Sequence, residues 1–168
     1  PDNKRLVVAT VRRGRAMLAI FDTDTGRVVQ EIPFTSRGEI FNPAWSPDGR
    51  RIAFSAQVDG FTNLYLYDFE STSLEALTDD AVADLQPSWS PDGRRLAFVT
   101  ERFTSTIDSL EYGAYQIGLI DVADKRVTRF AAGAGGDVTN PTWTPDGRAL
   151  YFVSTATGRP ELYRQTID

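Results

Sequence analysis

The chain has 168 residues, of which 41% are hydrophobic and 24% charged, and its formal net charge is −5. This length and composition suffice for one domain, while the acidic balance argues against nucleic-acid binding, which depends on clustered Lys and Arg. The sequence holds no Cys and no His, which excludes disulfides, thiolate metal sites and a Ser-His-Asp or Cys-His catalytic site built from these residues alone.

A repeated unit accounts for most of the chain. Its near copies are residues 43–54, 87–98 and 141–152, and residues 1–8 match the second half of the same unit, with Asn3 in place of Gly. Counted from the proline of the Pro-Asp-Gly or Pro-Asp-Asn step, the repeats start at 1, 47, 91 and 145, so they lie 46, 44 and 54 residues apart. Periods near 44 residues fit four short strands per repeat.

Each repeat predicts the same order of strands. A first strand ends in Trp-Ser or Trp-Thr, and a Pro-Asp-Gly turn leads into a second strand such as Arg51–Phe54. The third strand has alternating apolar residues, as in Ala19–Asp22 and Leu64–Asp68, and the fourth is represented by Arg27–Ile32. No segment has a helical period, so the sequence predicts an all-β fold.

The spacing and the strand order together predict a β-propeller with four-stranded blades. Here it is an incomplete stack of about three and a half to four blades. A residue set repeated in every blade serves a need that every blade has, so we interpret it as scaffold rather than as a ligand site. Trp45, Trp89 and Trp143 are expected to pack between neighbouring sheets, and Asp48, Asp92 and Asp146 to accept hydrogen bonds from turn amides.

These repeats resemble those of the TolB-type β-propellers. The resemblance rests on the pattern W-[ST]-P-D-G-R-x-[IL]-[AY]-F, on the later L-Y-x-Y-D strand, and on the strand end at Leu77-Thr78. It covers nearly the whole chain and implies that residues 1–168 are one partial propeller domain. As a guide to function it is less specific, because similar repeats occur in TolB-type envelope proteins and in the propellers of prolyl-oligopeptidase-like peptidases.

The predicted stack is not closed into a ring. It contains four pairs of second and third strands but three pairs of fourth and first strands, which leaves unpaired edges that are prone to association. Two explanations remain open. The chain is an excerpt of a longer protein with about six to eight blades, or two copies associate to complete a ring.

One connection between second and third strands carries an insertion. The interval from Phe54 to Leu64 is 10 residues, whereas the matching interval from Phe98 to Ile117 is 19. Aromatic residues and Arg are frequent at interface hot spots, and loops on rigid scaffolds often carry recognition. The sequence therefore offers Arg102, Phe103, Glu111, Tyr112 and Tyr115 as partner-binding residues. The alternative is a loop that only covers a neighbouring blade or domain.

A second candidate site is a set of acids ahead of each first strand. Glu39, Asp84 and Asp137 lie three or four residues before Pro43, Pro87 and Pro141, where they could surround the mouth of the central channel. Converging carboxylates attract cations or basic peptide groups. The alternative is that they are solvated turn residues and local caps.

The sequence predicts a binding module rather than an enzyme. It has no P-loop, no G-x-S-x-G and no metalloprotease motif, and we expect neither a cofactor nor a metal. The favoured function is a non-catalytic propeller that binds a protein or peptide in the bacterial periplasm or cell envelope, as the resemblance implies. The alternative is the substrate-gating propeller of a prolyl-oligopeptidase-like serine peptidase. No nucleic-acid partner and no direct membrane insertion by this segment are expected, and self-association to complete the ring remains possible.

Overall fold

A computed structural model describes residues 3–34, 38–109, 111–132 and 136–167 of the chain. In these residues the fold is all-β, with fourteen strands and a single 3₁₀ turn at Ile107–Ser109. No helix in the described part of the chain is long and apolar enough to cross a membrane. The predicted fold class is confirmed.

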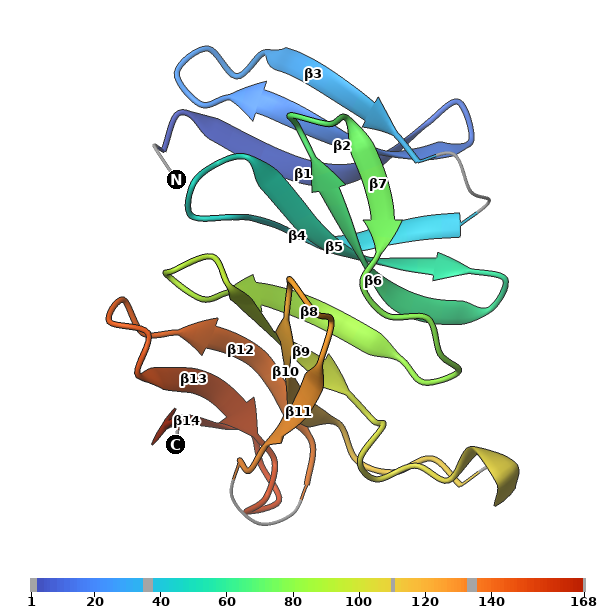
Figure 1. Cartoon of the computed structure of the whole chain (residues 1–168), viewed down its shortest axis with the longest axis vertical. Helices are drawn as coiled ribbons and strands as arrows, with labels where there is room; N and C mark the ends of the chain where they lie inside the picture. Colours follow the sequence, from blue (N-terminus) through green and yellow to red (C-terminus); the bar gives the residue numbers. More distant parts are fainter. Residues whose placement is uncertain (1–2, 35–37, 110, 133–135, 168) are drawn as a thin grey trace.

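The strands form four antiparallel sheets, which are stacked along the long axis of the molecule as the blades of an incomplete propeller (Figure 1). We number the blades 1 to 4 in chain order. Blade 1 contains β1 (Arg5–Arg12), β2 (Arg15–Asp22) and β3 (Val28–Pro33). Blade 2 contains β4 (Gly38–Trp45), β5 (Arg51–Val58), β6 (Phe61–Asp68) and β7 (Ser73–Ala76).

The third and fourth blades follow the same order. Blade 3 contains β8 (Asp84–Trp89), β9 (Arg95–Thr100), β10 (Gln116–Asp121) and β11 (Val127–Phe130). Blade 4 contains β12 (Val138–Trp143), β13 (Ala149–Ser154) and β14 (Glu161–Thr166). The predicted counts of strand pairs are confirmed, because the first strand is missing from blade 1 and the fourth from blade 4 in the described residues.

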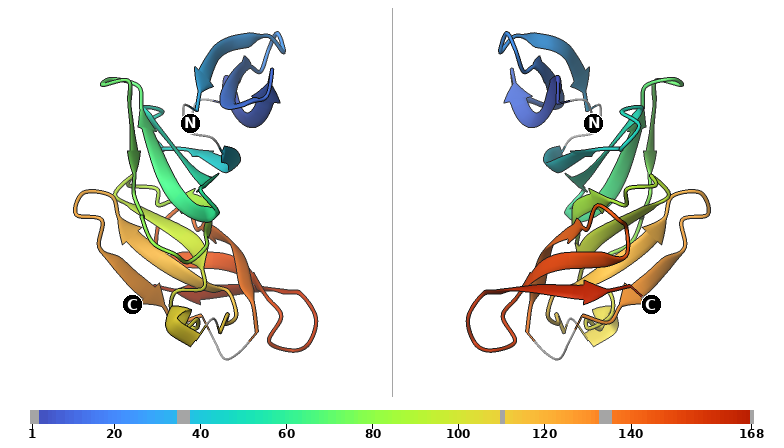
Figure 2. Two further views of the ribbon diagram at one scale, coloured as in Figure 1. Left: turned by 90° about the vertical axis from the view of Figure 1, so that its right-hand side faces the viewer. Right: turned by 90° about the vertical axis from the view of Figure 1, so that its left-hand side faces the viewer.

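The sheets spread like a fan about the side on which the first strands lie (Figure 2). The strand β4 contacts β8, and β8 contacts β12, while in blade 1 the second strand β1 takes the place beside β4. Three hydrophobic clusters, one at each junction between consecutive blades, form the core. Leu18, Ile52 and Phe54 belong to the first of these clusters and are almost fully buried.

The Pro-Asp-Gly turns have the predicted structure. Asp48 Oδ1 accepts hydrogen bonds from Ser46 Oγ at 2.6 Å and from the Arg50 amide at 3.0 Å, and the turns after β8 and β12 repeat the arrangement. Gly49 has a φ of +69°, a left-handed conformation that glycine adopts without strain. Asn3 has a φ of +59°, which confirms that Asn takes the role of glycine in the first repeat.

The repeated tryptophans lie between neighbouring sheets, as predicted. Trp89 Nε1 donates to the Ala44 carbonyl of the preceding blade at 3.1 Å, and Trp143 Nε1 donates to the Ser88 carbonyl at 3.0 Å. The preceding blade also places an arginine over each indole ring: Arg51 lies 4.9 Å above the Trp89 ring. These residues join consecutive blades, so the scaffold interpretation of the repeat is supported by direct contacts.

Candidate functional site

The insertion is the feature that distinguishes blade 3 from the other blades. The insertion connects β9 to β10, and its described residues, 101–109 and 111–115, extend away from the stack at the lower right of Figure 1. The corresponding connections in blades 1 and 2 are the short turns at Arg13-Gly14 and Asp59-Gly60. The extra length therefore makes a projection on one side of an otherwise regular rim.

The body of the insertion is held by its own hydrogen bonds. Thr106 and Glu111 form a two-residue bridge, in which the Thr106 amide donates to the Glu111 carbonyl at 2.8 Å and the Glu111 amide donates back at 3.1 Å. Closer to the blade, Thr104 Oγ1 donates to the Ala114 carbonyl at 2.6 Å. A Cβ atom at Gly113 would lie 2.4 Å from Thr104, so the two sides of the loop approach closely because glycine stands there.

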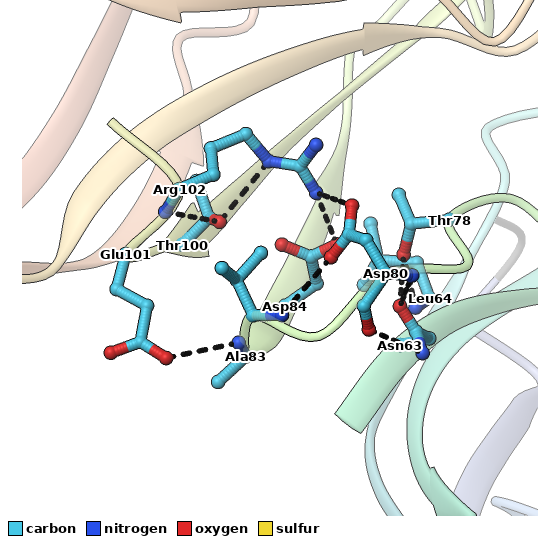
Figure 3. Close-up of polar contacts among 10 residues, drawn as sticks. Asn63, Leu64, Thr78, Asp80, Ala83, Asp84, Thr100, Glu101 and Arg102 are labelled. Atoms are coloured by element: carbon cyan, nitrogen blue, oxygen red, sulfur yellow. Dashed lines mark hydrogen bonds and ion pairs between the residues drawn. The ribbon is translucent and has the colours of Figure 1, made fainter. Parts of the chain in front are cut away.

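Arg102 fixes the root of the insertion (Figure 3). One of its guanidinium nitrogens lies 2.6 Å from Asp84 Oδ2 and 3.0 Å from Asp80 Oδ2, and its Nε donates to Thr100 Oγ1 at 3.2 Å. The guanidinium also lies over the Phe98 ring, 5.5 Å from the centroid. With 19% of its side chain exposed, Arg102 is engaged in holding the loop and has few donors left for a partner.

Asp84, the first residue of β8, is a fully buried carboxylate beside the start of the insertion. It has no exposed surface, and its Oδ1 atom forms no hydrogen bond among the described residues. Burial raises the pKa of Asp84, and the charge of Arg102 opposes this effect. Removal of Arg102 would leave this charge uncompensated inside the protein, so the pair makes the root sensitive to either partner.

The connection between blades 2 and 3 completes the root. Asn63 Oδ1 accepts hydrogen bonds from Thr78 Oγ1 and from the Asp80 amide, both at 3.2 Å (Figure 3). Farther along this connection, the Ala83 amide donates to Glu101 Oε1 at 3.3 Å. The insertion thus lies beside the loop between a fourth and a first strand, so these two kinds of loop lie together on one rim of the stack.

The other end of the insertion is attached to blade 4. The Tyr115 amide donates to Asp137 Oδ1 at 2.9 Å, and the Val138 amide donates to the Tyr115 carbonyl at 2.8 Å. Burial, followed by the nearby charges of Glu101 and Asp137, raises the pKa of the Tyr115 hydroxyl. The insertion therefore spans the junction of blades 3 and 4 and is anchored at both ends.

Two large apolar side chains are presented at the tip. Tyr112 is 69% exposed and Ile107 is 39% exposed, and the acidic side chains of Asp108 and Glu111 beside them are also exposed. Phe103 is half-buried, with the Arg129 guanidinium 5.9 Å from its ring centroid. Of the five partner-binding residues suggested by the sequence, Glu111 and Tyr112 lie at the exposed tip, whereas Arg102, Phe103 and Tyr115 hold the loop in place.

The structure does not arrange the three candidate acids as one ring. Asp84 pairs with Thr100 of the neighbouring strand, and Glu39 pairs with Gln57. When the repeats are aligned, Glu39 therefore lies one residue earlier in its first strand than Asp84 does. Since side chains alternate along a strand, Asp84 points to the opposite face from Glu39 and is buried. Asp137 occupies the position of Glu39 but accepts the hydrogen bond from Tyr115.

The first strands do line a groove of about 480 Å³, but the candidate acids are not among its lining residues. The groove is lined instead by proline, small residues, tryptophan and the amides Asn42, Gln86 and Asn140. Within the described residues, no group of three or more His, Cys, Asp or Glu side chains is placed to hold a metal ion.

Sequence reasoning named Arg102 and Asp84 but not their pairing, and it missed the other residues that make the root. The Asp84–Pro87 interval is three residues, whereas Glu39–Pro43 and Asp137–Pro141 are four. This difference of one residue was the available signal that Asp84 faces the interior. Nothing in the sequence pattern points to Asp80 or Thr100 as partners of Arg102.

Comparison with known protein families identifies the repeat. Residues 1–107 match the family model described as the TolB beta propeller domain. The Tol-Pal system protein TolB of Bordetella pertussis is 30% identical over 138 residues, which make up 82% of this chain and 30% of that protein. A TolB homolog of Protochlamydia amoebophila is 44% identical over 36 residues, or 21% of this chain and 8% of that protein.

Solved structures agree with the sequence comparison. TolB from Acinetobacter baumannii superposes with a TM-score of 0.78 at 29% identity, over 98% of this chain and 39% of that chain. The tricorn protease superposes with a TM-score of 0.61 at 18% identity, over 90% of this chain and 14% of that chain, which is a similarity of fold alone. The chain spans about 30% of the length of the Bordetella relative.

Proposed function

Because this chain belongs to the TolB β-propeller family, we propose that it is a non-catalytic module that binds a protein partner of the bacterial cell envelope. Its relatives are named as Tol-Pal system proteins, which supports a periplasmic location and a partner from that system. The absence of His and Cys from the sequence supports a role in binding rather than in catalysis. The peptidase alternative is less well supported, since the likeness to the tricorn protease is limited to the fold.

The tip of the insertion is the surface that we propose for this binding. The observation that carries the proposal is the combination of a 69% exposed Tyr112 with a loop anchored at both ends, by Arg102 and by Asp137. An exposed tyrosine on a preorganised loop offers a large contact area at a small entropic cost. Ile107 and Glu111 extend the same surface.

The test is a binding measurement with single substitutions at the tip. Purified Tol-Pal components from the bacterium that encodes this chain are titrated into it by calorimetry. We expect one of them to bind, and we expect Tyr112→Ala to weaken that binding about thirtyfold, the effect of a hot-spot residue worth about 2 kcal/mol. Phe61→Ala is the matched control, because Phe61 is a 50% exposed aromatic residue at the start of β6, next to the short second-to-third-strand turn of blade 2.

A second measurement locates the contact directly. A photo-crosslinking amino acid placed at position 112 should crosslink to the same Tol-Pal component in the living cell, whereas one at position 61 should not. Unchanged affinity of Tyr112→Ala, together with crosslinking at both positions or at neither, would refute the assignment of the tip.

A further inference from the structure

The projecting tip of the insertion carries acids beside its exposed apolar side chains. Asp108 directly follows Ile107, and Glu111 directly precedes Tyr112, and all four side chains are exposed. Residues 103–115 contain no Lys and no Arg. Neither carboxylate forms a hydrogen bond or an ion pair with another described residue. The negative charge of the tip is therefore not neutralised from within the loop.

The arginines near the insertion have other contacts. Arg102 lies at the root, where one of its guanidinium nitrogens contacts two carboxylates at once (Figure 3). Arg129 lies beside the ring of Phe103, 5.9 Å from the ring centroid. The connection between blades 2 and 3, which lies beside the root, adds the exposed carboxylate of Asp79. A partner that approaches this part of the rim therefore meets an excess of negative charge.

Backbone hydrogen bonds hold the two pairs of apolar and acidic side chains in place. The bridge between Thr106 and Glu111 joins the residue before Ile107 to the residue before Tyr112. Asp108 lies within the 3₁₀ turn at Ile107–Ser109. Because the backbone of both pairs is already fixed, charges on a partner can pair with these acids at a reduced entropic cost.

The acids indicate which kind of surface the tip contacts. Apolar side chains on a projecting loop suit either a lipid bilayer or a protein. Membrane-binding segments carry Lys or Arg beside their apolar side chains, because anionic headgroups attract cations and repel acids such as Asp108 and Glu111. A basic protein surface instead gains charge pairing with both acids. The charge of the tip thus favours a protein over a membrane.

We propose that the tip docks onto a basic surface of a protein partner. Tyr112 and Ile107 enter an apolar depression in that surface, and Lys or Arg side chains around the depression pair with Asp108 and Glu111. This inference rests on the function proposed above and adds the chemistry of the partner. The apolar contacts slow dissociation, whereas the charges around them speed association and make its rate depend on salt.

Association kinetics with the Tol-Pal component that binds the chain test this proposal. Asp108→Asn combined with Glu111→Gln removes both charges and keeps the shapes of the side chains. At about 20 mM NaCl we expect the double variant to associate about tenfold more slowly than the original chain, with little change in the dissociation rate. At about 500 mM NaCl the two chains should associate at similar rates, because salt screens the charges.

Glu70→Gln combined with Asp124→Asn is the matched control, since it changes the net charge by the same amount. Both side chains are exposed and lie in turns between third and fourth strands, beside the Pro-Asp-Gly turns: the Phe69 amide donates to the Arg50 carbonyl. This control should associate at the original rate. Equal slowing by the two double variants would show an effect of net charge alone and would overturn the assignment to the tip.

These kinetics distinguish failure of the proposal from failure of the proposed function. If Tyr112→Ala weakens binding while the charge-neutralised tip associates at the original rate at every salt concentration, the tip binds a partner whose surface is not basic. If no Tol-Pal component binds, the proposed function fails, and two measurements that need no partner then decide the proposal.

The first of these measurements uses a single thiol. The chain has no Cys, so Ser109→Cys provides a unique thiol at the tip, and Ala123→Cys provides one at an exposed position where neighbouring acids and bases balance. The rate of modification by a cationic methanethiosulfonate, divided by the rate with an anionic one, should be about threefold higher at position 109. Neutralising Asp108 and Glu111 should remove this difference. Equal ratios in the original chain would overturn the proposal.

The second measurement tests the membrane alternative by cosedimentation. Vesicles of phosphatidylethanolamine and phosphatidylglycerol should not bind the chain, because their anionic surface repels the tip. Vesicle binding that Tyr112→Ala abolishes would show that the tip enters lipid, and would likewise overturn the proposal.

Discussion

Arg102 compensates a carboxylate that would otherwise be charged and unpaired in the interior. Arg102→Met retains much of the length of the side chain but removes the guanidinium, and we expect the free energy of unfolding to fall by about 3 kcal/mol at pH 7. Burial already raises the pKa of Asp84, and without Arg102 the pKa rises further. A raised pKa in the folded state means that stability is lost as the pH rises through it, so the defect should be smaller at pH 4.

Urea denaturation at the two pH values measures this difference. Arg159→Met is the control, because the ion pair of Arg159 with Glu161 is made by a side chain that is 80% exposed and should contribute little at either pH. An equal loss of stability at pH 4 and pH 7 would contradict the assignment of a buried charge to Asp84.

The turn aspartates change the pH dependence of stability in the opposite direction to Asp84. The Ser90 hydroxyl, and then the Arg94 amide, lower the pKa of Asp92 below its ordinary value of 3.8. A lowered pKa stabilises the fold above pH 3.8, and this stability is lost as the pH falls through the folded-state value. Asp92→Asn keeps an acceptor oxygen but cannot ionise, so it should cost at most about 1 kcal/mol at pH 7. The substitution should also reduce the loss of unfolding free energy between pH 5 and pH 2. If that loss is unchanged, protonation of Asp92 does not contribute to it.

At the scale of elements, the insertion depends on the residue that directly precedes the first strand of the next blade, Asp137. Asp137→Ala removes the acceptor of the Tyr115 amide, so we expect faster hydrogen exchange in residues 111–116 with a change in unfolding free energy of about 1 kcal/mol. Asp137→Asn retains an oxygen at that place and should behave like the original chain. If both substitutions accelerate exchange equally, the carboxylate oxygen is not the anchor.

The strands and turns could be predicted because their residues recur. Trp-Ser-Pro-Asp-Gly specifies the end of one strand and the turn to the next, and the structure has the turn at each predicted place. The fourth strand of blade 1 begins at Val28, one residue later than predicted. The burial of the Asp84 side chain was not predicted. Asp84 lies one residue later in its repeat than Glu39 and Asp137 do in theirs, and because side chains alternate along a strand, this shift turns Asp84 to the opposite face of the sheet.

The contacts of the insertion could not be predicted from the sequence, for a second physical reason. Arg102 meets Asp84 where β8 and β9 pair, and Tyr115 meets Asp137 across the junction of blades 3 and 4. No periodicity in the sequence connects residues about twenty positions apart in this way. The sequence therefore indicated which loop differs, and it named Tyr112, which the structure places at the exposed tip. It could not distinguish the residues that hold the loop from those that the loop presents.

For the molecule as a whole, the stack predicts an uneven distribution of stability. Blades 2 and 3 have four strands and a neighbour on each side, whereas blades 1 and 4 have three strands and expose residues such as Leu6 and Leu162. Local opening is easiest where few apolar contacts are made. Hydrogen exchange monitored by mass spectrometry should therefore show slower exchange in β5 and β9 than in β1 and β14, and uniform protection across the four blades would contradict this.

The arginines that follow the turns reveal an asymmetry between the two sides of the stack. Arg5, Arg51 and Arg95 each lie about 5 Å from the ring centroid of the next blade's tryptophan, but the fourth repeat has Ala149 at this position. Blade 4 thus offers no cation to an indole laid against it. A tryptophan packed against blade 4 would still find the Thr142 carbonyl in the place of Ala44 and Ser88, but it would lack the cation–π contact, so we expect mechanical separation of a larger assembly to begin at that seam.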